Sequence, residues 1–252
     1  MNDLEQGGAQ QVAPDFSLAL LFFNEEKSVI PAVTSLKDAL NQAGINFELI
    51  LVNNGSTDRT PILIKKLVSS DRRLRQVEIE VNLGYGWGAI NGLNAARGEW
   101  IGFMAGDGQV DPADVVRLFR ESGSGYALIK VKRAQRQDGL IRTWISNIYV
   151  MTFCLLFGLP FYDINATPRI FRRSWLEKFQ FSSRDWFLDA EILIKTKFLG
   201  LTVKEIPIIF RRRERGSSNV NLNTIFEFMK NIIRFRFGKE LAQWKRKTRL
   251  KS

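Results

Sequence analysis

The residues that could do chemistry in this chain are carboxylates, amides and basic side chains, because the sequence contains no histidine. That absence excludes Ser-His-Asp and Cys-His hydrolysis and every histidine-ligated metal. A single cysteine, Cys154, excludes an internal disulfide and a cysteine-based zinc site, and it is typical of a reducing compartment. Whatever chemistry occurs must therefore use carboxylates, amides, Lys and Arg, or the backbone.

Four compact polar loops each follow an expected strand. They cover residues 24–26, 53–58, 82–88 and 107–109. Each loop alone has an ordinary explanation, since Asn24 suits a turn and Ser56 or Asp58 suits a helix cap. Ligands of parallel α/β sheets bind beyond the carboxyl ends of the strands. Four such loops at one edge together predict a ligand site there.

The glycines of the third loop allow another interpretation. Gly84, Gly86 and Ala89 match the spacing of a dinucleotide fingerprint, and Asp107 lies roughly where a ribose-binding acid would be. The pattern follows the third expected strand rather than the first. A nicotinamide site is therefore disfavoured.

The elements that must position these loops alternate along 252 residues, a length that suits one large domain or two small ones. Apolar runs and alternation predict strands, and helical spacing predicts helices between them. This order predicts an α/β fold with a doubly wound, mostly parallel sheet and helices on both faces. The expected strands are 16–23, 47–52, 76–81, 100–104, 126–131 and 202–210, and the expected helices are 26–43, 57–67, 88–96, 111–119, 143–158 and 189–198.

The second half of the chain contains two segments that are less regular. Residues 163–173 are expected to form a loop. The stretch 143–162 carries no charge and has about the length of a membrane span, but it contains Ser146, Gly158 and Pro160. We expect a partly buried or interfacial helix there instead.

The basic charge is concentrated in the last fifth of the chain. The net charge is +11, and the part from Lys204 onward holds 14 Lys and Arg against 4 Asp and Glu. Such a tail is typical of binding to an anionic membrane or to nucleic acid. Between Ile225 and Phe237 the basic residues alternate with large apolar ones, which disfavours nucleic acid and predicts an amphipathic helix on a membrane surface. Packing of this helix on the sheet is the alternative.

The chain is expected to form three units. Residues 1–15 are polar, resemble no secretory signal and are expected to form a flexible arm. Residues 16–220 form the α/β domain. Residues 221–252 form the basic amphipathic tail.

Motifs in the order FFNEE, VNNGSTDRT and NLGYGWGAINGLNAARGEWIGFMAGDGQVDP resemble glycosyltransferase family 2, whose fold is called GT-A. The later segments KRAQRQDGLIRTWIS, DINATPRIFRRS and FLDAEILIKTKFLGLTVKEIPIIFRRRERGSSN are similar to the polyprenyl-phosphate sugar synthases, the dolichyl-phosphate mannose synthase group. The resemblance covers about residues 16–220. It implies an inverting transferase that moves a sugar from a nucleotide-diphosphate sugar to a polyprenyl phosphate in cell-envelope glycan biosynthesis.

The resemblance also implies roles for individual residues. Asp107 and Gln109 match the metal site for Mg²⁺ or Mn²⁺, and Glu191 matches a Glu on the helix that faces the active site. Arg133, Arg142 and Ser146 fall where the acceptor phosphate binds. Catalytic roles are expected for Asp107, Glu191 and Arg213. Contacts with the nucleotide sugar are expected for Asn24, Glu25, Asn54, Ser56, Asp58, Gly84, Gly86, Arg213 and Ser218, the last two in a loop that closes over the donor diphosphate.

This chain departs from the family pattern at three places. Asn53 and Asn54 stand where the family has two Asp residues, Ala105 replaces the first Asp of the metal motif, and Asn219 replaces a Lys. Magnesium often uses one or two carboxylates together with substrate phosphates and waters, so a site with one carboxylate is chemically reasonable. A catalytically silent subunit that binds nucleotide sugar, and a transferase acting on a glycan acceptor, remain as alternatives.

The charges of the leaving group and of the acceptor determine what the transfer reaction needs from the protein. A nucleotide diphosphate leaves readily only if the charge that develops on it is neutralised. Asp107 and Gln109 would hold a divalent ion against it, and Arg213 would add a bidentate hydrogen-bond donor. A phosphate monoester is already an anion near pH 7, so it can attack the anomeric carbon without a histidine base. Arg133 and Arg142 would orient it in line with the leaving group.

The lipid of such an acceptor would lie along the uncharged helix that follows the phosphate site. Spanning the membrane with this helix would place Asp107 and Arg213 on opposite sides. We therefore expect a peripheral protein on the cytoplasmic side, held by the amphipathic helix and by basic residues worth ~1 kcal/mol each near an anionic surface. A separate membrane-spanning partner subunit is kept as an alternative, although no residue of this sequence indicates one.

Overall fold

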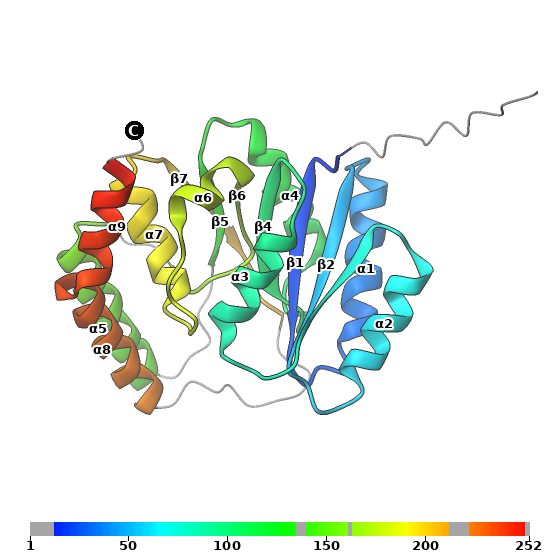
Figure 1. Ribbon diagram of the computed structural model, residues 1–252, viewed down its shortest axis with the longest axis horizontal. Coiled ribbons are helices and arrows are strands. Elements are labelled where there is room, and N and C mark those ends of the chain that lie inside the picture. The colour runs from blue at the N-terminus through cyan, green and yellow to red at the C-terminus, as the bar shows by residue number, and fades with distance from the viewer. Residues whose placement is uncertain (1–12, 135–139, 161–162, 212–221, 250–252) are drawn as a thin grey trace, which may run out of the picture.

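The computed structural model describes residues 13–134, 140–160, 163–211 and 222–249, and it describes residues 140–147, 149, 222–228 and 249 by their backbone only. A seven-stranded sheet in the order β3-β2-β1-β4-β6-β5-β7 forms the centre (Figure 1). The strands are β1 (Phe16–Phe22), β2 (Phe47–Asn54), β3 (Leu74–Ile79), β4 (Trp100–Ala105), β5 (Leu128–Arg133), β6 (Arg169–Arg172) and β7 (Val203–Ile208).

The sheet is parallel except for β6, which pairs antiparallel with both β4 and β5. The expected doubly wound, mostly parallel sheet is thereby confirmed. Residues 163–173 were expected to form a loop, and that expectation is wrong for β6. Its four residues are too few to show a pattern, and Arg169 at its start, a residue type that is rarely buried, is fully enclosed. Pro168 before it also suggested a turn.

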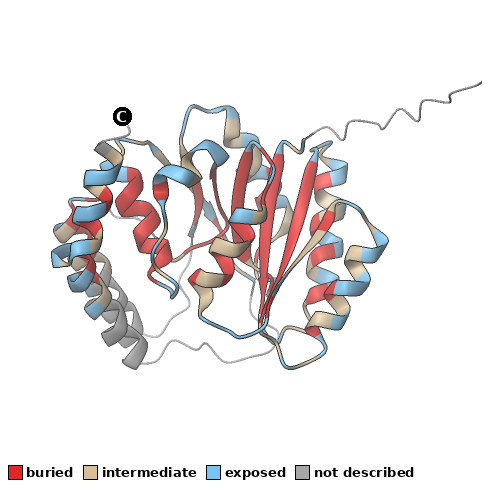
Figure 2. Ribbon diagram, in the orientation of Figure 1, coloured by how far each residue is buried: buried red, intermediate tan, exposed pale blue. Residues whose placement is uncertain are grey.

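Helices cover both faces of the sheet and build two cores (Figure 2). Leu18 and Leu20 of β1 point to one face, while Ala19 and Leu21 point to the other, as the two-residue period of a strand requires. The first face is covered by α1 (Val29–Gln42), α2 (Thr60–Ser70) and α4 (Pro112–Arg120). The second is covered by α3 (Tyr85–Ala95), α5 (Leu140–Phe157), α7 (Leu188–Phe198), α8 (Leu222–Phe237) and α9 (Lys239–Arg249).

Short helical segments and one well-defined cap complete the fold. The turns η1 (Glu121–Gly123) and η2 (Arg173–Trp175) and the short helix α6 (Leu176–Phe179) connect the longer elements. The carboxylate of Asp111 accepts a hydrogen bond from Ala113 N at 2.9 Å, with Pro112 as the first helical residue. Asp is favoured at the N-cap and Pro at the first helical position, so the start of the helix expected over 111–119 follows from these two residue types.

The basic tail is part of the second core. Ile232 and Phe235 of α8 and Leu241 and Trp244 of α9 are buried, and the Phe235 ring packs 5.2 Å from that of Phe187. The burial of Ile232 and Phe235 agrees with the alternative stated above, in which this helix packs against the domain. Spacing alone could not distinguish the two apolar surfaces of α8, because both belong to one amphipathic pattern. No helix in the described part of the chain is long and apolar enough to cross a membrane.

Candidate active site

The loops after β1 and β2 are joined by hydrogen bonds at the carboxyl edge of the sheet. Asn24, which has a φ of 55°, accepts from Thr57 N through its side-chain oxygen at 2.8 Å, and its own N–H donates to Ser56 Oγ at 3.0 Å. Asp58 accepts from Glu26 N at 3.1 Å. Partial burial raises the pKa of Asp58, but hydrogen bonds from Thr60 and Glu26 outweigh that effect and leave it lowered.

Glu25 belongs to the same junction. Its N–H donates to Thr60 Oγ1 at 2.9 Å, and its carboxylate accepts from Ser28 Oγ at 2.9 Å. The structure therefore brings four predicted nucleotide contacts together: Asn24, Glu25, Ser56 and Asp58.

The two asparagines that end β2 hold the neighbouring loops. Asn53 Nδ2 donates to Glu78 of β3, and Asn53 Oδ1 accepts from Ser56 N at 3.1 Å. Asn54 is buried, and its Nδ2 donates to Gly84 O at 3.1 Å. Within the part of the chain that the structure describes, its Oδ1 has no hydrogen-bond partner, which leaves a buried acceptor at this edge. Amides suit these positions because each side chain must donate to an oxygen, which an ionised aspartate cannot do.

The glycines after β3 have a packing explanation. A Cβ at Gly84, whose φ is 111°, would lie 2.5 Å from Arg184 O, and a Cβ at Gly86 would lie 2.6 Å from Asp185 O. Trp87 N donates to the same Arg184 O at 2.8 Å. Gly84 and Gly86 are thus needed where the start of α3 meets the backbone of residues 183–185. This packing explains both glycines without the predicted contact with the nucleotide sugar.

Asp107 and Gln109 lie in the loop after β4. Gln109 N donates to Asp107 Oδ1 at 3.1 Å, and Gln109 Nε2 donates to Arg211 O at 3.1 Å. Arg211 N donates in return to Gln109 O at 2.8 Å. The chain that leaves β7 is therefore fastened to the Asp107 loop two residues before Arg213.

The donor atoms of this loop suit a hard divalent ion. Among the described residues, no group of three or more His, Cys, Asp or Glu side chains could hold a metal. An ion here would therefore rely on the Asp107 carboxylate, the Gln109 amide oxygen and oxygens from the substrate. Carboxylate and amide oxygens are the ligands that Mg²⁺ and Mn²⁺ prefer, so the residues present fit such an ion.

Glu191 lies inside the protein on α7. It is fully buried, and its carboxylate accepts from Ser182 N at 3.0 Å, Ser182 Oγ at 2.8 Å and Ser183 N at 2.8 Å, besides an ion pair with Lys195. These partners occupy the carboxylate and fix residues 182–183. The geometry therefore favours an anchoring role for Glu191 over the predicted catalytic role.

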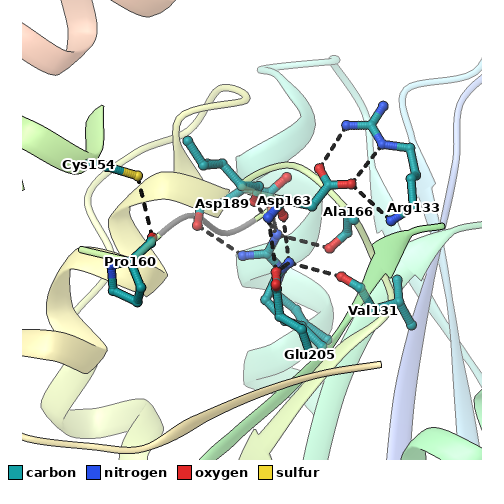
Figure 3. A network of polar contacts seen from close by, with 11 residues as sticks. Val131, Arg133, Cys154, Pro160, Asp163, Ala166, Asp189 and Glu205 are labelled. Atoms are coloured by element: carbon teal, nitrogen blue, oxygen red, sulfur yellow. Dashed lines mark hydrogen bonds and ion pairs between the residues drawn. The ribbon is translucent and has the colours of Figure 1, made fainter. Parts of the chain in front are cut away.

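Arg133, a predicted acceptor ligand, ends β5 and is bound to Asp163. Its Nε and Nη2 donate to the two carboxylate oxygens at 2.8 Å each, and its backbone N donates to Oδ2 at 3.0 Å (Figure 3). Burial raises the pKa of Asp163, but the bonds from Arg133 and the charge of Lys130 lower it to about 2. The bidentate pair fixes the guanidinium plane of Arg133 at the carboxyl edge.

Lys130 lies beneath this pair. Its ammonium group is fully buried and donates to Val131 O at 2.9 Å, to Glu205 Oε1 at 3.0 Å and to Asp163 O. Burial lowers the pKa of Lys130 to about 8. Three acceptors compensate for the desolvation of this charge.

A second buried pair joins β6 to α7. Arg169 donates to Ile164 O at 2.8 Å and to Asp189 O at 2.9 Å, and its guanidinium lies 3.0 Å from the Asp189 carboxylate. Burial raises the pKa of Asp189 to about 6, although the charge of Arg169 opposes this shift. Burial likewise raises the pKa of Tyr85 well above its ordinary value, and the negative charges of Asp189 and Asp107 add to that rise.

Four predicted site residues cannot be placed by their side chains. Arg142 and Ser146 lie on α5 in the part described by its backbone only. Arg213 and Ser218 lie outside the described residues, as does Asn219.

Comparison with known proteins decides the family. The model of glycosyl transferase family 2 matches residues 17–181. The chain belongs to glycosyl transferase family 2. It is a glycosyltransferase by family, and the matched segment runs from the second residue of β1 through β6 and includes the loops after β1 to β4.

Two curated relatives are similar over most of this glycosyltransferase. A dodecaprenyl-phosphate galacturonate synthase from Rhizobium johnstonii is 28% identical over 232 residues, which cover 88% of this chain and 67% of the relative. An undecaprenyl-phosphate 4-deoxy-4-formamido-L-arabinose transferase from Photorhabdus laumondii subsp. laumondii is 26% identical over 219 residues, covering 86% and 66% respectively. The chain spans about two thirds of the length of these relatives.

A solved structure shares the fold. Glucosyl-3-phosphoglycerate synthase from Mycobacterium tuberculosis, crystallised with Mn²⁺, uridine diphosphate and phosphoglyceric acid, superposes with a TM-score of 0.67 at 19% identity. The match covers 88% of this chain and 78% of that one. At this identity the likeness shows the fold alone, and it agrees with the GT-A arrangement expected for the glycosyltransferase.

Sequence reasoning missed several residues at this edge. Asp163 and Arg169 were overlooked because β6 was not predicted, so nothing placed residues 163–168 beside the site. Asp189 could have been noticed as a second acid two positions before Glu191. Trp186 carried no signal in the sequence, since a single tryptophan between Asp185 and Phe187 shows no periodic pattern.

Proposed function

We propose that this glycosyltransferase moves a sugar, with inversion at the anomeric carbon, from a nucleotide-diphosphate sugar to a polyprenyl phosphate at a membrane surface. One observation carries the proposal: three groups lie at the same edge of the sheet. They are the Asp107 loop, the Arg133–Asp163 pair, and the chain that leads from Arg211 to Arg213. Both relatives named above are described as acting with a polyprenyl phosphate, which supports the acceptor class.

The donor half of the site would use the loops after β1, β2 and β4. Asn24, Glu25 and Asn54 would contact the nucleotide, while Asp107 and Gln109 would hold Mg²⁺ or Mn²⁺ against the diphosphate. Such an ion neutralises charge that develops on the leaving diphosphate. Arg213 would add a fixed cation to the same group, because Arg211 brings the chain to the Asp107 loop.

The acceptor half would use the end of β5 and the start of α5. Arg133, oriented by Asp163, would hold the acceptor phosphate together with Arg142 and Ser146. A phosphate oxygen would attack the anomeric carbon from the side opposite the leaving group. Its lone pair forms the new C–O bond, while the electrons of the old C–O bond leave with the nucleoside diphosphate. No base is required, because the attacking oxygen is already anionic near pH 7.

Action at a membrane surface is supported by exposed apolar residues among cations on α5 and α8. Leu155 and Phe237 are 76% and 72% exposed, and Ile148, Met151 and Ile233 are also exposed. These two helices are neighbours, since Arg236 Nε donates to Leu156 O at 3.1 Å. Lys230, Arg234 and Arg236 are exposed on the same helix α8. Apolar area combined with cations is what binding to an anionic bilayer requires.

The membrane proposal carries two further assignments. The active face would lie on the cytoplasmic side, where nucleotide sugars are available. Residues 221–252 would form the membrane-facing unit, with the difference that their buried residues also belong to the domain core. A membrane-spanning partner subunit would be found by co-purification from detergent-solubilised membranes.

The proposal is tested by incubating the protein with nucleotide sugars, polyprenyl phosphate and Mg²⁺ or Mn²⁺, then analysing the lipid extract by mass spectrometry. We expect a glycosylated polyprenyl phosphate that disappears in excess chelator. Donor binding without any glycosylated product would instead favour the catalytically silent alternative that Ala105 suggests. Product on an added glycan but not on lipid would favour a different acceptor.

A further inference from the structure

Trp186 is an exposed tryptophan on a loop that other contacts already hold. The loop 182–187 is fixed by Glu191, which accepts from the N–H groups of Ser182 and Ser183, and by Asp185, which accepts from Phe187 N at 2.9 Å. Trp186 nonetheless leaves 45% of its surface in solvent. A ligand that covers this apolar surface would gain free energy from its removal from water.

One face of this indole is covered, and its plane is therefore fixed. The ring stacks on Tyr85 with centroids 4.3 Å apart and an interplanar angle of 12°. Tyr85 is held in turn by an edge contact with Phe103, whose centroid lies 6.1 Å away. A rigid aromatic surface binds a ligand without a large loss of side-chain entropy.

The same pair of rings leads to the reaction centre. The hydroxyl of Tyr85 is hydrogen-bonded with Thr167, and the charges of Asp189 and Asp107 both act on it. Phe103, which Tyr85 contacts, lies two residues before the end of β4. The two rings therefore connect the carboxyl end of β4, beyond which the donor diphosphate would lie, with Trp186.

We propose that Trp186 is the donor-sugar platform: its exposed face packs against the sugar ring of the nucleotide sugar and contributes to the choice of sugar. This inference rests on the proposed function. Sugar rings have an apolar face of C–H groups, and the negative face of an aromatic ring attracts the positive edges of such groups. The hydroxyl groups of the sugar remain free to bind polar neighbours.

A lipid tail is the less suitable occupant. The residues beside Trp186 on its N-terminal side, Arg184 and Asp185, are exposed and charged, and Ser183 before them is polar. A polyprenyl chain requires contiguous apolar surface, as the exposed residues of α5 and α8 provide. A sugar ring suits an isolated aromatic face surrounded by polar groups.

The test compares binding of nucleotide sugars with binding of the bare nucleotides. Full-length wild type, Trp186→Ala, Trp186→Phe and the control Phe198→Ala are titrated by calorimetry with UDP-glucose, UDP-galacturonic acid, UDP-N-acetylglucosamine, GDP-mannose, UDP and GDP in the presence of Mn²⁺. Phe198 suits the control because it is 42% exposed at the opposite end of α7.

We expect Trp186→Ala to weaken the best-bound nucleotide sugar about 3- to 10-fold and to leave the matching bare nucleotide unchanged. Trp186→Phe should retain most of the affinity, and Phe198→Ala should bind as wild type does. Melting curves check that each variant is folded. If Trp186→Ala does not fold, Trp186→Leu keeps apolar bulk without a flat face and gives the same comparison.

Other results overturn the inference in distinguishable ways. Equal loss for nucleotide sugar and bare nucleotide would show that Trp186 only supports the loop. No loss for either would remove it from the site, and weaker liposome flotation with unchanged sugar affinity would assign it to lipid. If the wild type binds the bare nucleotide as tightly as every nucleotide sugar, the role of Trp186 as a platform is overturned but the proposed function is not. If the wild type binds none of the six compounds, the proposed function is overturned as well.

Discussion

Two phenylalanines of α8 separate the structural part of the C-terminal helices from the membrane-facing part. Phe235 is 2% exposed and packs against Phe187, whereas Phe237, two residues later, is 72% exposed. Truncating each to alanine removes the same atoms from opposite environments. The two substitutions are therefore matched controls for one another.

The expected changes differ in kind. Phe235→Ala should reduce the free energy of unfolding by about 3–5 kcal/mol, the usual cost of removing a buried phenylalanine. At 2–4 °C per kcal/mol for a domain of this size, the melting temperature should fall by roughly 6–20 °C. Phe237→Ala should change the free energy of unfolding by less than about 0.5 kcal/mol, because its ring contributes little to the core.

Membrane affinity should show the reverse order. A phenylalanine side chain that inserts fully removes about 150–250 Å² from water, and partial insertion at the interface is worth about 1–2 kcal/mol. Phe237→Ala should therefore weaken binding to anionic liposomes about 5- to 30-fold. Phe235→Ala, measured below its melting temperature, should float as wild type does.

The assay is a thermal melt by circular dichroism beside a flotation assay on vesicles containing phosphatidylglycerol, at low salt and at 1 M salt. Salt should weaken flotation of every variant, because the Debye length falls to about 3 Å at 1 M. A Phe235→Ala protein that melts with wild type would refute the core assignment of α8. A Phe237→Ala protein with undiminished flotation would refute its contact with the membrane.

Three further predictions concern the reaction and the buried charges. Asp107→Asn should lower kcat/KM at least about 100-fold in a metal-titrated transfer assay, whereas Ala105→Asp should keep activity or bind metal more tightly; full activity of Asp107→Asn in excess chelator would remove the metal role. Arg142→Ala should raise the KM for polyprenyl phosphate while calorimetry finds the nucleotide-sugar Kd unchanged, and a large loss of donor affinity would move Arg142 to the donor half. Because its folded pKa of about 2 lies below the ordinary carboxyl value of 3.8, Asp163 contributes stability above pH 4 that is lost as the pH falls toward 2. Asp163→Asn should therefore cost about 2 kcal/mol at pH 7 and flatten the denaturation profile between pH 4 and 2, and an unchanged profile would show that the Arg133 pair does not stabilise the fold.

Much of the fold could be predicted because its central strands are nearly continuous apolar runs. β1, β2 and β4 are covered on both faces, and each was expected within two residues of its observed bounds. The cap at Asp111 followed from side-chain chemistry that acts within three residues. Local rules of this kind need no knowledge of what lies across the sheet.

The remaining features depend on contacts between segments far apart in the sequence. Gly84 and Gly86 match the spacing of a dinucleotide fingerprint, yet their small size is needed where residues 183–185 approach them. Glu191 resembled a site residue, yet its partners are backbone N–H groups that precede it by eight and nine positions. Residue type alone cannot distinguish a carboxylate that faces a ligand from one that fixes a loop.

The antiparallel strand β6 explains why so many of the missed residues meet at the site. In this sheet the parallel strands all end at the carboxyl edge, so a strand of opposite direction must begin there. The segment that enters β6 therefore runs along the same edge as the loops after β1, β2, β4 and β5. Burying Arg169 at the start of β6 then requires acceptors, which the carbonyls of Ile164, Ala166 and Asp189 supply. These hydrogen bonds fix the segment that enters β6, and the same segment carries Asp163, which binds Arg133. One antiparallel strand therefore helps to position the arginine that the acceptor phosphate would contact.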